Sequence, residues 1–159
     1  MTVIAAPRIL VAGSINTDLV MHVASAPEAG ETVTGLSFET FGGGKGANQA
    51  VAAARSGAAV AILGGTGDDD FGRQRRYDLE REGISLQAVS LFPKLASGVA
   101  IILVESGGQN RIAYVPGATW GVTAELAVGA LEEWQPDVVL ATLEHRGDTL
   151  EALWQAAKT

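Results

Sequence analysis

The chain has 159 residues, which suits one globular domain, and its content of 47% hydrophobic and 18% charged residues excludes intrinsic disorder. The net charge of −7 argues against nucleic acid and against an anionic membrane surface as partners, and a neutral small molecule suits it better. The chain has no cysteine, which excludes disulfides and thiolate metal sites and favours a cytoplasmic location.

Strands and helices alternate along the first half of the chain. We expect strands at 8–13, 19–23, 31–34 and 59–63, and helices at 45–56 and 69–82. The first of these strands is a continuous rather than an alternating apolar run, which is typical of a strand buried on both faces. Each helix is followed by a glycine, Gly57 or Gly83, at the position where a left-handed cap belongs.

The second half repeats this alternation after a hairpin. Its strands are expected at 97–104, 111–115 and 137–143, and its helices at 123–134 and 148–158. Thr123 is the predicted N-cap of the first helix, and Asp148 with Glu151 forms a capping-box-like pair in the second. The pattern predicts an α/β fold, with a mainly parallel sheet flanked by helices and a small separate β-sheet. Because the last strand would normally have a further neighbour, we expect 1–159 to be a single truncated domain, incomplete on its C-terminal side.

A run of three glycines at 42–44 precedes Lys45 and Asn48. The run is not a phosphate-binding P-loop, because Glu39 stands where its first glycine belongs, and it fails the dinucleotide fingerprint, because Ala47 replaces the third glycine. Consecutive glycines still allow a ligand to approach the backbone, and Lys45 and Asn48 provide hydrogen-bond donors at a helix start. On these residues alone, a ligand site and a plain strand-to-helix turn remain equally open.

Other polar residues favour the ligand site. Asn16 and Asp18 follow the first strand, and Glu144 follows the last, at the strand ends where open parallel sheets bind their ligands. Each of them could singly be a turn residue or a solvated surface acid. Together with Lys45 and Asn48 they would form one cleft of carboxylate acceptors and amide or ammonium donors, which is the chemistry that recognises a polyhydroxylated molecule.

Several motifs, in this order, resemble those of the ribokinase-like (PfkB) sugar kinases. They are Gly13-Ser14-Ile15-Asn16-Thr17-Asp18, Gly30-Glu31-Thr32-Val33, Gly43-Gly44-Lys45-Gly46-Ala47-Asn48, Gly67-Asp68-Asp69 with Phe71-Gly72, and Leu143-Glu144. The resemblance covers essentially the whole chain. It implies that the sugar hydroxyls are bound by Asn16, Asp18, Gly44, Lys45, Asn48 and Glu144. It also implies a β-sheet lid built from residues 15–40 and 97–115, with Ala100 and Ile102 over the sugar and a homodimer contact through the lid.

The resemblance further implies an activity: ATP-dependent phosphorylation of ribose, or a similar sugar, at its 5-hydroxyl, with Mg²⁺ and a monovalent cation such as K⁺. The catalytic aspartate and the ATP site belong to the second half of the family's chain. We therefore expect the base beyond Thr159, and we expect this chain alone to be catalytically incomplete and to bind none of these cofactors. The alternatives are a non-catalytic sugar-binding or lid-mediated dimerisation module, or a kinase of a nucleoside, fructose or 2-keto-3-deoxygluconate.

One turn, Gly65-Thr66-Gly67-Asp68, could be mistaken for the family's catalytic motif. The three aspartates that start the next helix, 68–70, would repel phosphate, so we expect them to cap the helix instead. On that helix Arg73, Arg75 and Arg76 are expected to form a solvated face. His145 is isolated in the sequence, which predicts a surface or lid position and no metal site.

Overall fold

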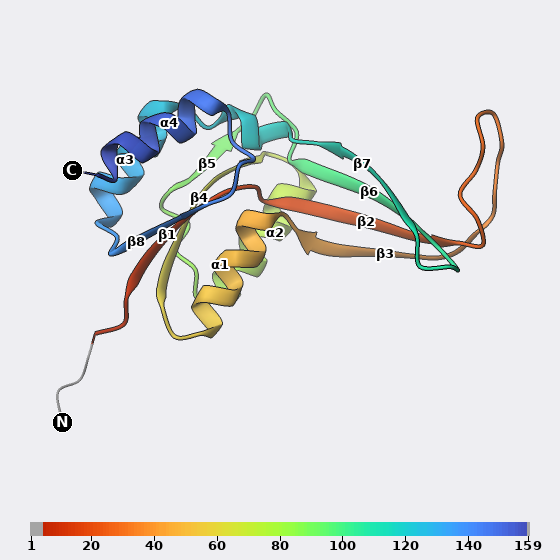
Figure 1. Cartoon of the computed structure of the whole chain (residues 1–159), viewed down its shortest axis with the longest axis horizontal. Coiled ribbons are helices and arrows are strands. Elements are labelled where there is room, and N and C mark those ends of the chain that lie inside the picture. The colour runs from red at the N-terminus through yellow and green to blue at the C-terminus, as the bar shows by residue number, and fades with distance from the viewer. Residues whose placement is uncertain (1–4, 159) are drawn as a thin grey trace.

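The computed structural model describes residues 5–158, which form a helix-covered body and a long β-sheet arm (Figure 1). The strands are β1 (Arg8–Ala12), β2 (Asn16–Val23), β3 (Gly35–Gly43), β4 (Ala59–Gly67), β5 (Val89–Phe92), β6 (Gly98–Glu105), β7 (Asn110–Val115) and β8 (Val138–Ala141). The helices are α1 (Lys45–Arg55), α2 (Asp70–Arg81), the 3-10 helix η1 (Gly117–Gly121), α3 (Ala124–Trp134) and α4 (Gly147–Ala156). No helix among residues 5–158 is long and apolar enough to cross a membrane.

The body is built on a parallel sheet of strand order β5-β4-β1-β8. Side chains of the inner strand β1 alternate between the two faces of this sheet. Val11 packs with the apolar side chains of α1 and α2 on one face, and Leu10 packs with those of α3 and α4 on the other. Because each fully buried side chain of this size contributes about 1.5–3 kcal/mol, β1 requires helices on both faces. This confirms the predicted mainly parallel sheet flanked by helices.

The arm is a second four-stranded sheet, of order β3-β2-β6-β7. β2 pairs with β6 in parallel and with β3 antiparallel, and β6 and β7 form the predicted hairpin. Since β2 follows β1 after three residues, the arm starts at the carboxyl end of the parallel sheet (Figure 1). The arm therefore stands over the edge at which open parallel sheets bind ligands.

Several strands differ from the sequence prediction, since β2 already begins at Asn16 and β4 continues to Gly67. The strand predicted at 31–34 is instead β3, Gly35–Gly43, so that Gly42 and Gly43 pair with β2 rather than form a loop. Tertiary pairing here overrides the low strand propensity of glycine. The strand β5 is not predicted by the sequence, because four residues give too short a pattern to recognise.

Helix ends were mostly as expected. Gly57 and Gly83 have φ values of 94° and 75°, which are the predicted left-handed conformations. Thr123 caps α3 through the backbone N–H of Leu126. The prediction was wrong at α4, where the N-cap is Arg146, so Asp148 lies inside the first turn and accepts a hydrogen bond from its neighbour rather than capping the helix.

An aspartate, Asp69, caps the start of α2, as predicted. Asp69 Oδ1 accepts a hydrogen bond from Gly72 N at 2.7 Å, and the same carboxylate accepts from Ser97 N and Ser97 Oγ at 2.8 and 2.7 Å. Burial alone would raise the pKa of Asp69, but these hydrogen bonds hold it below the ordinary value. Residues 65–67, which we expected to form a turn, are instead the end of β4 and pair with β5. Gly67 N donates a hydrogen bond to Ser97 Oγ at 2.9 Å, so the segment before α2 is a structural connection.

Candidate functional site

A cavity of about 300 Å³ lies between the arm, the start of α1 and the end of β8. It is lined by Asn16, Asp18, Gly44, Lys45, Asn48, Ala100, Ile102, Ile112, Tyr114 and Glu144. All eight residues that the sequence analysis singled out for sugar binding are therefore brought together. Ile112 and Tyr114 were missed.

Glycines make the close approach of three segments possible. Gly44, between β3 and α1, has a φ of 96°, and a side chain there would come within 2.5 Å of Ser14 O. The same carbonyl accepts a hydrogen bond from Ala47 N at 3.0 Å, which fixes the first turn of α1 to the β1–β2 connection. Lys45 and Asn48 consequently face the cavity beside the first residue of β2, Asn16.

Glu144 is the most strongly held side chain of the site. Its Oε2 accepts hydrogen bonds from Ser14 Oγ at 2.6 Å and Thr142 Oγ1 at 3.1 Å, and its Oε1 accepts one from Lys45 Nζ at 2.7 Å. Burial alone would raise the pKa of Glu144, but these three donors hold it below the ordinary value. The hydrogen bond and charge of Glu144 raise the pKa of Lys45 in turn. The site thus presents a fixed carboxylate and a fully charged ammonium.

The backbone next to Glu144 is fixed by two neighbours that sequence reasoning did not find. The buried ring of His145 lies 3.1 Å (Nδ1) from Thr119 O and 3.2 Å (Nε2) from Leu63 O. Trp120 Nε1 donates a hydrogen bond to Glu144 O at 3.2 Å. The expected surface or lid position of His145 was wrong, because its buried ring lies between Leu63 of β4 and Thr119 of η1.

Asp18 contrasts with Glu144, since no donor among residues 5–158 makes a hydrogen bond to its carboxylate. The carboxylate lies directly over Gly43, where any side chain would collide with it. Burial raises the pKa of Asp18, and the positive charge of Arg75 partly opposes that rise. Asp18 therefore keeps free acceptor capacity that points at the cavity.

The apolar side of the cavity comes from the arm. The register pairs Ala100 with Tyr114 and Ile102 with Ile112, and paired residues lie on the same face of a sheet. Burial raises the pKa of the Tyr114 phenol. The period-two pattern of 110–115, counted across the hairpin turn from Ala100, is the signal that could have identified Tyr114.

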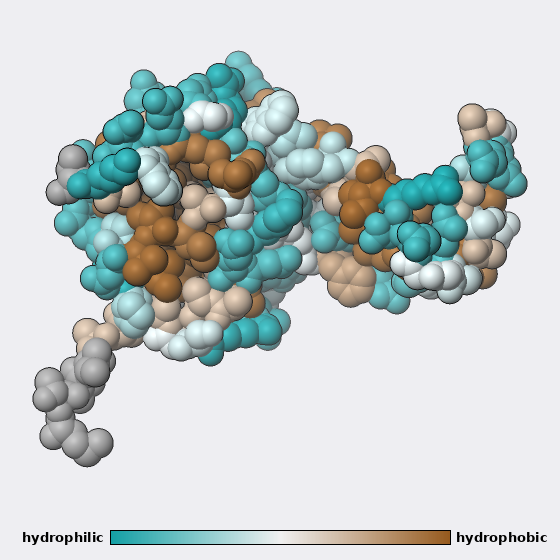
Figure 2. All heavy atoms as spheres, viewed as in Figure 1, coloured by the Kyte–Doolittle hydropathy of each residue, from teal (hydrophilic) through white to brown (hydrophobic). Residues whose placement is uncertain are grey.

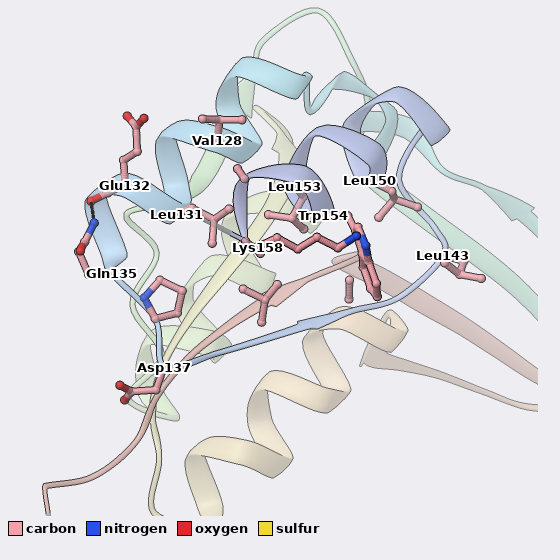
Figure 3. Close-up of a pocket in the computed structure, with 15 residues that line it drawn as sticks. Val128, Leu131, Glu132, Gln135, Asp137, Leu143, Leu150, Leu153, Trp154 and Lys158 are labelled. Carbon is pink, nitrogen blue, oxygen red and sulfur yellow. Dashed lines mark hydrogen bonds between the residues drawn. The ribbon is translucent and has the colours of Figure 1, made fainter.

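A larger groove of about 720 Å³ lies elsewhere, between α3, α4 and β8. Figure 3 shows its lining, in which Leu150, Leu153 and Trp154 of α4 lie near β8, with the Lys158 side chain beside the Trp154 ring. Figure 2 shows an apolar surface on this side of the body. The groove is mostly apolar and has no convergent set of polar groups, whereas the smaller cavity combines an apolar wall with two carboxylates, two amides and an ammonium. The smaller cavity is therefore the candidate functional site.

Comparison with known proteins agrees with this architecture. The model of the pfkB family carbohydrate kinases matches residues 6–158. The ribokinase of Bacillus subtilis is 43% identical over 146 residues, which cover 91% of this chain and 49% of that protein. The chain spans about half, or less, of the length of the curated relatives it matches.

Solved structures show the same fold. The crystal structure of ribokinase from Thermotoga maritima has a TM-score of 0.80 at 34% identity, covering 91% of this chain and 48% of that one. The structure of Arabidopsis thaliana ribokinase complexed with ribose and ATP has a TM-score of 0.78 at 28% identity, covering 96% of this chain and 52% of that one. The family match extends over nearly all of the residues that build the two sheets and the cavity, and the chain belongs to the pfkB family of carbohydrate kinases.

Proposed function

We propose that this chain supplies the sugar-binding part of an ATP-dependent kinase that phosphorylates ribose, or a similar sugar, at its 5-hydroxyl. The observation that carries the proposal is the convergence of Asp18, Lys45 and Glu144, from three distant segments, on one cavity. The names of the relatives support ribose as the first substrate to test, because the matched proteins from Bacillus subtilis and Thermotoga maritima are ribokinases.

The side chains suit a molecule that carries several hydroxyls. The carboxylate of Asp18 accepts from sugar O–H groups, and Asn16 and Asn48 can both donate and accept. Lys45 Nζ uses one hydrogen for Glu144 and offers its remaining hydrogens to sugar oxygens. Charge-assisted hydrogen bonds of this kind are roughly twice as strong as neutral ones. In this role the residues orient the sugar, and Ala100, Ile102 and Ile112 exclude water from one side of it.

We further propose that phosphoryl transfer is not carried out by this chain alone. The aspartates at 68–70 start α2, where Asp69 serves as its cap and Asp68 pairs with Arg73, so they suit neither phosphate nor the role of base. Mg²⁺ would neutralise phosphate oxygens during transfer. Residues 5–158 contain no group of three His, Cys, Asp or Glu that could hold a metal, and we assign ATP, Mg²⁺ and K⁺ to no residue of this chain.

Calorimetric titration with ribose tests the proposal. We expect the chain to bind ribose and Asp18→Ala to bind it roughly ten- to a hundred-fold more weakly, since a hydrogen bond to a charged group is worth about 1.5–3 kcal/mol. Asp70→Asn is the matched control, because that carboxylate is 98% exposed on α2, and it should bind as the parent does. Fructose and a nucleoside, titrated in parallel, test the alternative substrates. Equal affinity of Asp18→Ala and the parent would contradict the proposal.

An ADP-release assay with ribose, ATP, Mg²⁺ and K⁺ tests the second part. We expect no turnover by this chain. Turnover that Asp68→Asn abolishes would show that the Gly65–Asp68 segment is catalytic and would overturn its structural assignment.

We also propose that the arm acts as a lid and as the contact between two copies. It exposes large apolar side chains, which single chains rarely display together: Leu36, Phe38, Phe41, Ile101, Ile112 and Val115. Light scattering across a concentration series should give a dimer that Ile101→Glu dissociates. A monomer at every concentration would refute the contact and leave the sugar site untouched.

A further inference from the structure

Arg75 departs from the solvated helix face that the sequence predicted. Its side chain is only 9% exposed, whereas that of Arg73 on the same helix is 60% exposed. Arg75 Nη2 forms an ion pair with Asp78 Oδ2 at 2.7 Å. Its other two nitrogens, Nε and Nη1, are buried without a hydrogen-bond partner among residues 5–158.

This arrangement is unfavourable for stability. A buried donor without a partner costs about 1–3 kcal/mol, and an apolar side chain of similar length would avoid that cost. The ion pair with Asp78 accounts for one nitrogen of three, so stability does not explain why an arginine stands here. Residues that break a rule of stability are often found at functional sites.

The guanidinium of Arg75 lies against the strand that carries the glycine run. A side chain on Gly42 would come within 3.3 Å of Arg75 Nη1 and 3.6 Å of Cζ. The next residue, Gly43, lies directly beneath the Asp18 carboxylate. Because successive residues of a strand point to opposite faces, Arg75 and Asp18 lie on opposite sides of this two-glycine segment. Neither glycine has a side chain that would separate the two charges.

The charges interact across this segment. Arg75 is the positive group that opposes the rise in the pKa of Asp18 caused by burial. Protein between two charges screens them less than water does. The other ionisable groups that line the cavity do not lower the pKa of Asp18 in this way, since Lys45 is paired with Glu144 and Tyr114 is an acid. The negative charge of Asp78, beside Arg75, weakens the attraction between Arg75 and the Asp18 carboxylate without cancelling it.

We propose that Arg75 is a positioning residue of the candidate sugar site, which holds Asp18 as a hydroxyl-accepting carboxylate from the opposite face of the Gly42–Gly43 segment. The proposal rests on the proposed function of the cavity. It assigns to Arg75 an electrostatic role that acts through Asp18, without contact to the sugar. It also explains why both strand positions are glycine, since a side chain on either would push one of the two charges away.

The affinity for ribose as a function of pH tests this role. As the pH falls, we expect Arg75→Met to lose affinity for ribose at a higher pH than the parent does. The affinity of the parent divided by that of Arg75→Met should therefore be larger at pH 5 than at pH 8. Arg73→Met is the matched control, on the same helix but exposed, and should follow the parent curve. Titration of Glu144 occurs in all three proteins and therefore cancels in the comparison.

Two further measurements make the result decisive. The free energy of unfolding of Arg75→Met should equal or exceed that of the parent, and a clear loss of stability with a uniform loss of affinity at all pH values would show a merely structural role. Carbon NMR of the Asp18 carboxyl, without ligand, should give a higher pKa in Arg75→Met than in the parent. Equal pKa values would overturn the inference. Failure of the parent to bind ribose would instead overturn the proposed function, and the NMR titration would still decide the role of Arg75.

Discussion

Replacement of Glu144 by alanine should destabilise the fold, because this carboxylate joins three segments. It accepts hydrogen bonds from Ser14, Thr142 and Lys45. Ser14 and Thr142 are buried, so their hydroxyls would lose their acceptor where water cannot easily replace it. Lys45 has a side chain that is 73% exposed, against 14% for Glu144, and it can return to solvent.

The size of the effect follows from these differences. Each buried hydroxyl bonded to a charged acceptor contributes about 1.5 kcal/mol at the lower end of its range, and an exposed ion pair adds at most about 1 kcal/mol. Removal of the partly buried Glu144 carboxylate also removes the cost of taking its charge out of water, which offsets part of this loss. We therefore expect the free energy of unfolding to fall by about 2–3 kcal/mol in Glu144→Ala. In Glu144→Gln, which keeps one acceptor oxygen, we expect it to fall by about 1 kcal/mol.

Urea denaturation measures this loss. With a slope of about 2 kcal/mol per molar urea, Glu144→Ala should lower the midpoint by about 1–1.5 M at unchanged slope. Ser14→Ala is the partial control, which loses one of the two buried hydroxyls and should lower the midpoint by about 0.75 M. A midpoint for Glu144→Ala within about 0.2 M of the parent would refute the reasoning that this network holds the site together.

The same network has a pH dependence. The folded pKa of Glu144 is below its ordinary value of 4.5. A depressed folded pKa contributes stability above the unfolded pKa, and that stability is lost as pH falls through the folded value. The parent should therefore lose stability below about pH 4.5 more steeply than Glu144→Gln does. Parallel curves for the two proteins would show that Glu144 does not contribute in this way.

Two further pairs of variants test other parts of the account. Gly43→Ala should weaken ribose binding at least tenfold, because its methyl group would collide with the Asp18 carboxylate. Gly107→Ala, whose methyl group meets no atom within 4 Å, should bind ribose as the parent does. Calorimetry measures both affinities, and equal values for the two variants would contradict the geometry. In thermal melts, Asp69→Ala should lose about 2 kcal/mol of unfolding free energy, because it removes the helix cap and the hydrogen bonds with Ser97 before β6. Asp70 is exposed, so Asp70→Ala should change the unfolding free energy by less than about 0.5 kcal/mol.

The parallel sheet could be predicted because its signals are local. The apolar run of β1 and the left-handed glycines after α1 and α2 are each recognisable within a few residues, and both agree with the structure. The convergence of Asn16, Asp18 and Glu144 followed from one general rule, that the carboxyl ends of parallel strands share an edge. The positions of these residues in the cavity agree with that rule.

Other features depend on tertiary contacts that carry no local signal. Arg75 resembles its exposed neighbours in sequence, and only the packing of α2 beneath the glycine strand buries it. His145 has no partner nearby in the chain, because its two carbonyl acceptors belong to Leu63 and Thr119. Tyr114 reaches the cavity only through the register of β6 and β7.

Mapping of backbone amide chemical shifts during a titration with ribose tests the central claim most directly. The account predicts that ribose shifts the amides of Asp18, Gly44, Lys45 and Glu144 together, with a common affinity, and leaves those of α3 and α4 unchanged. Shifts confined to the apolar groove between α3, α4 and β8, or the absence of any shift at the cavity at saturating ribose, would contradict it.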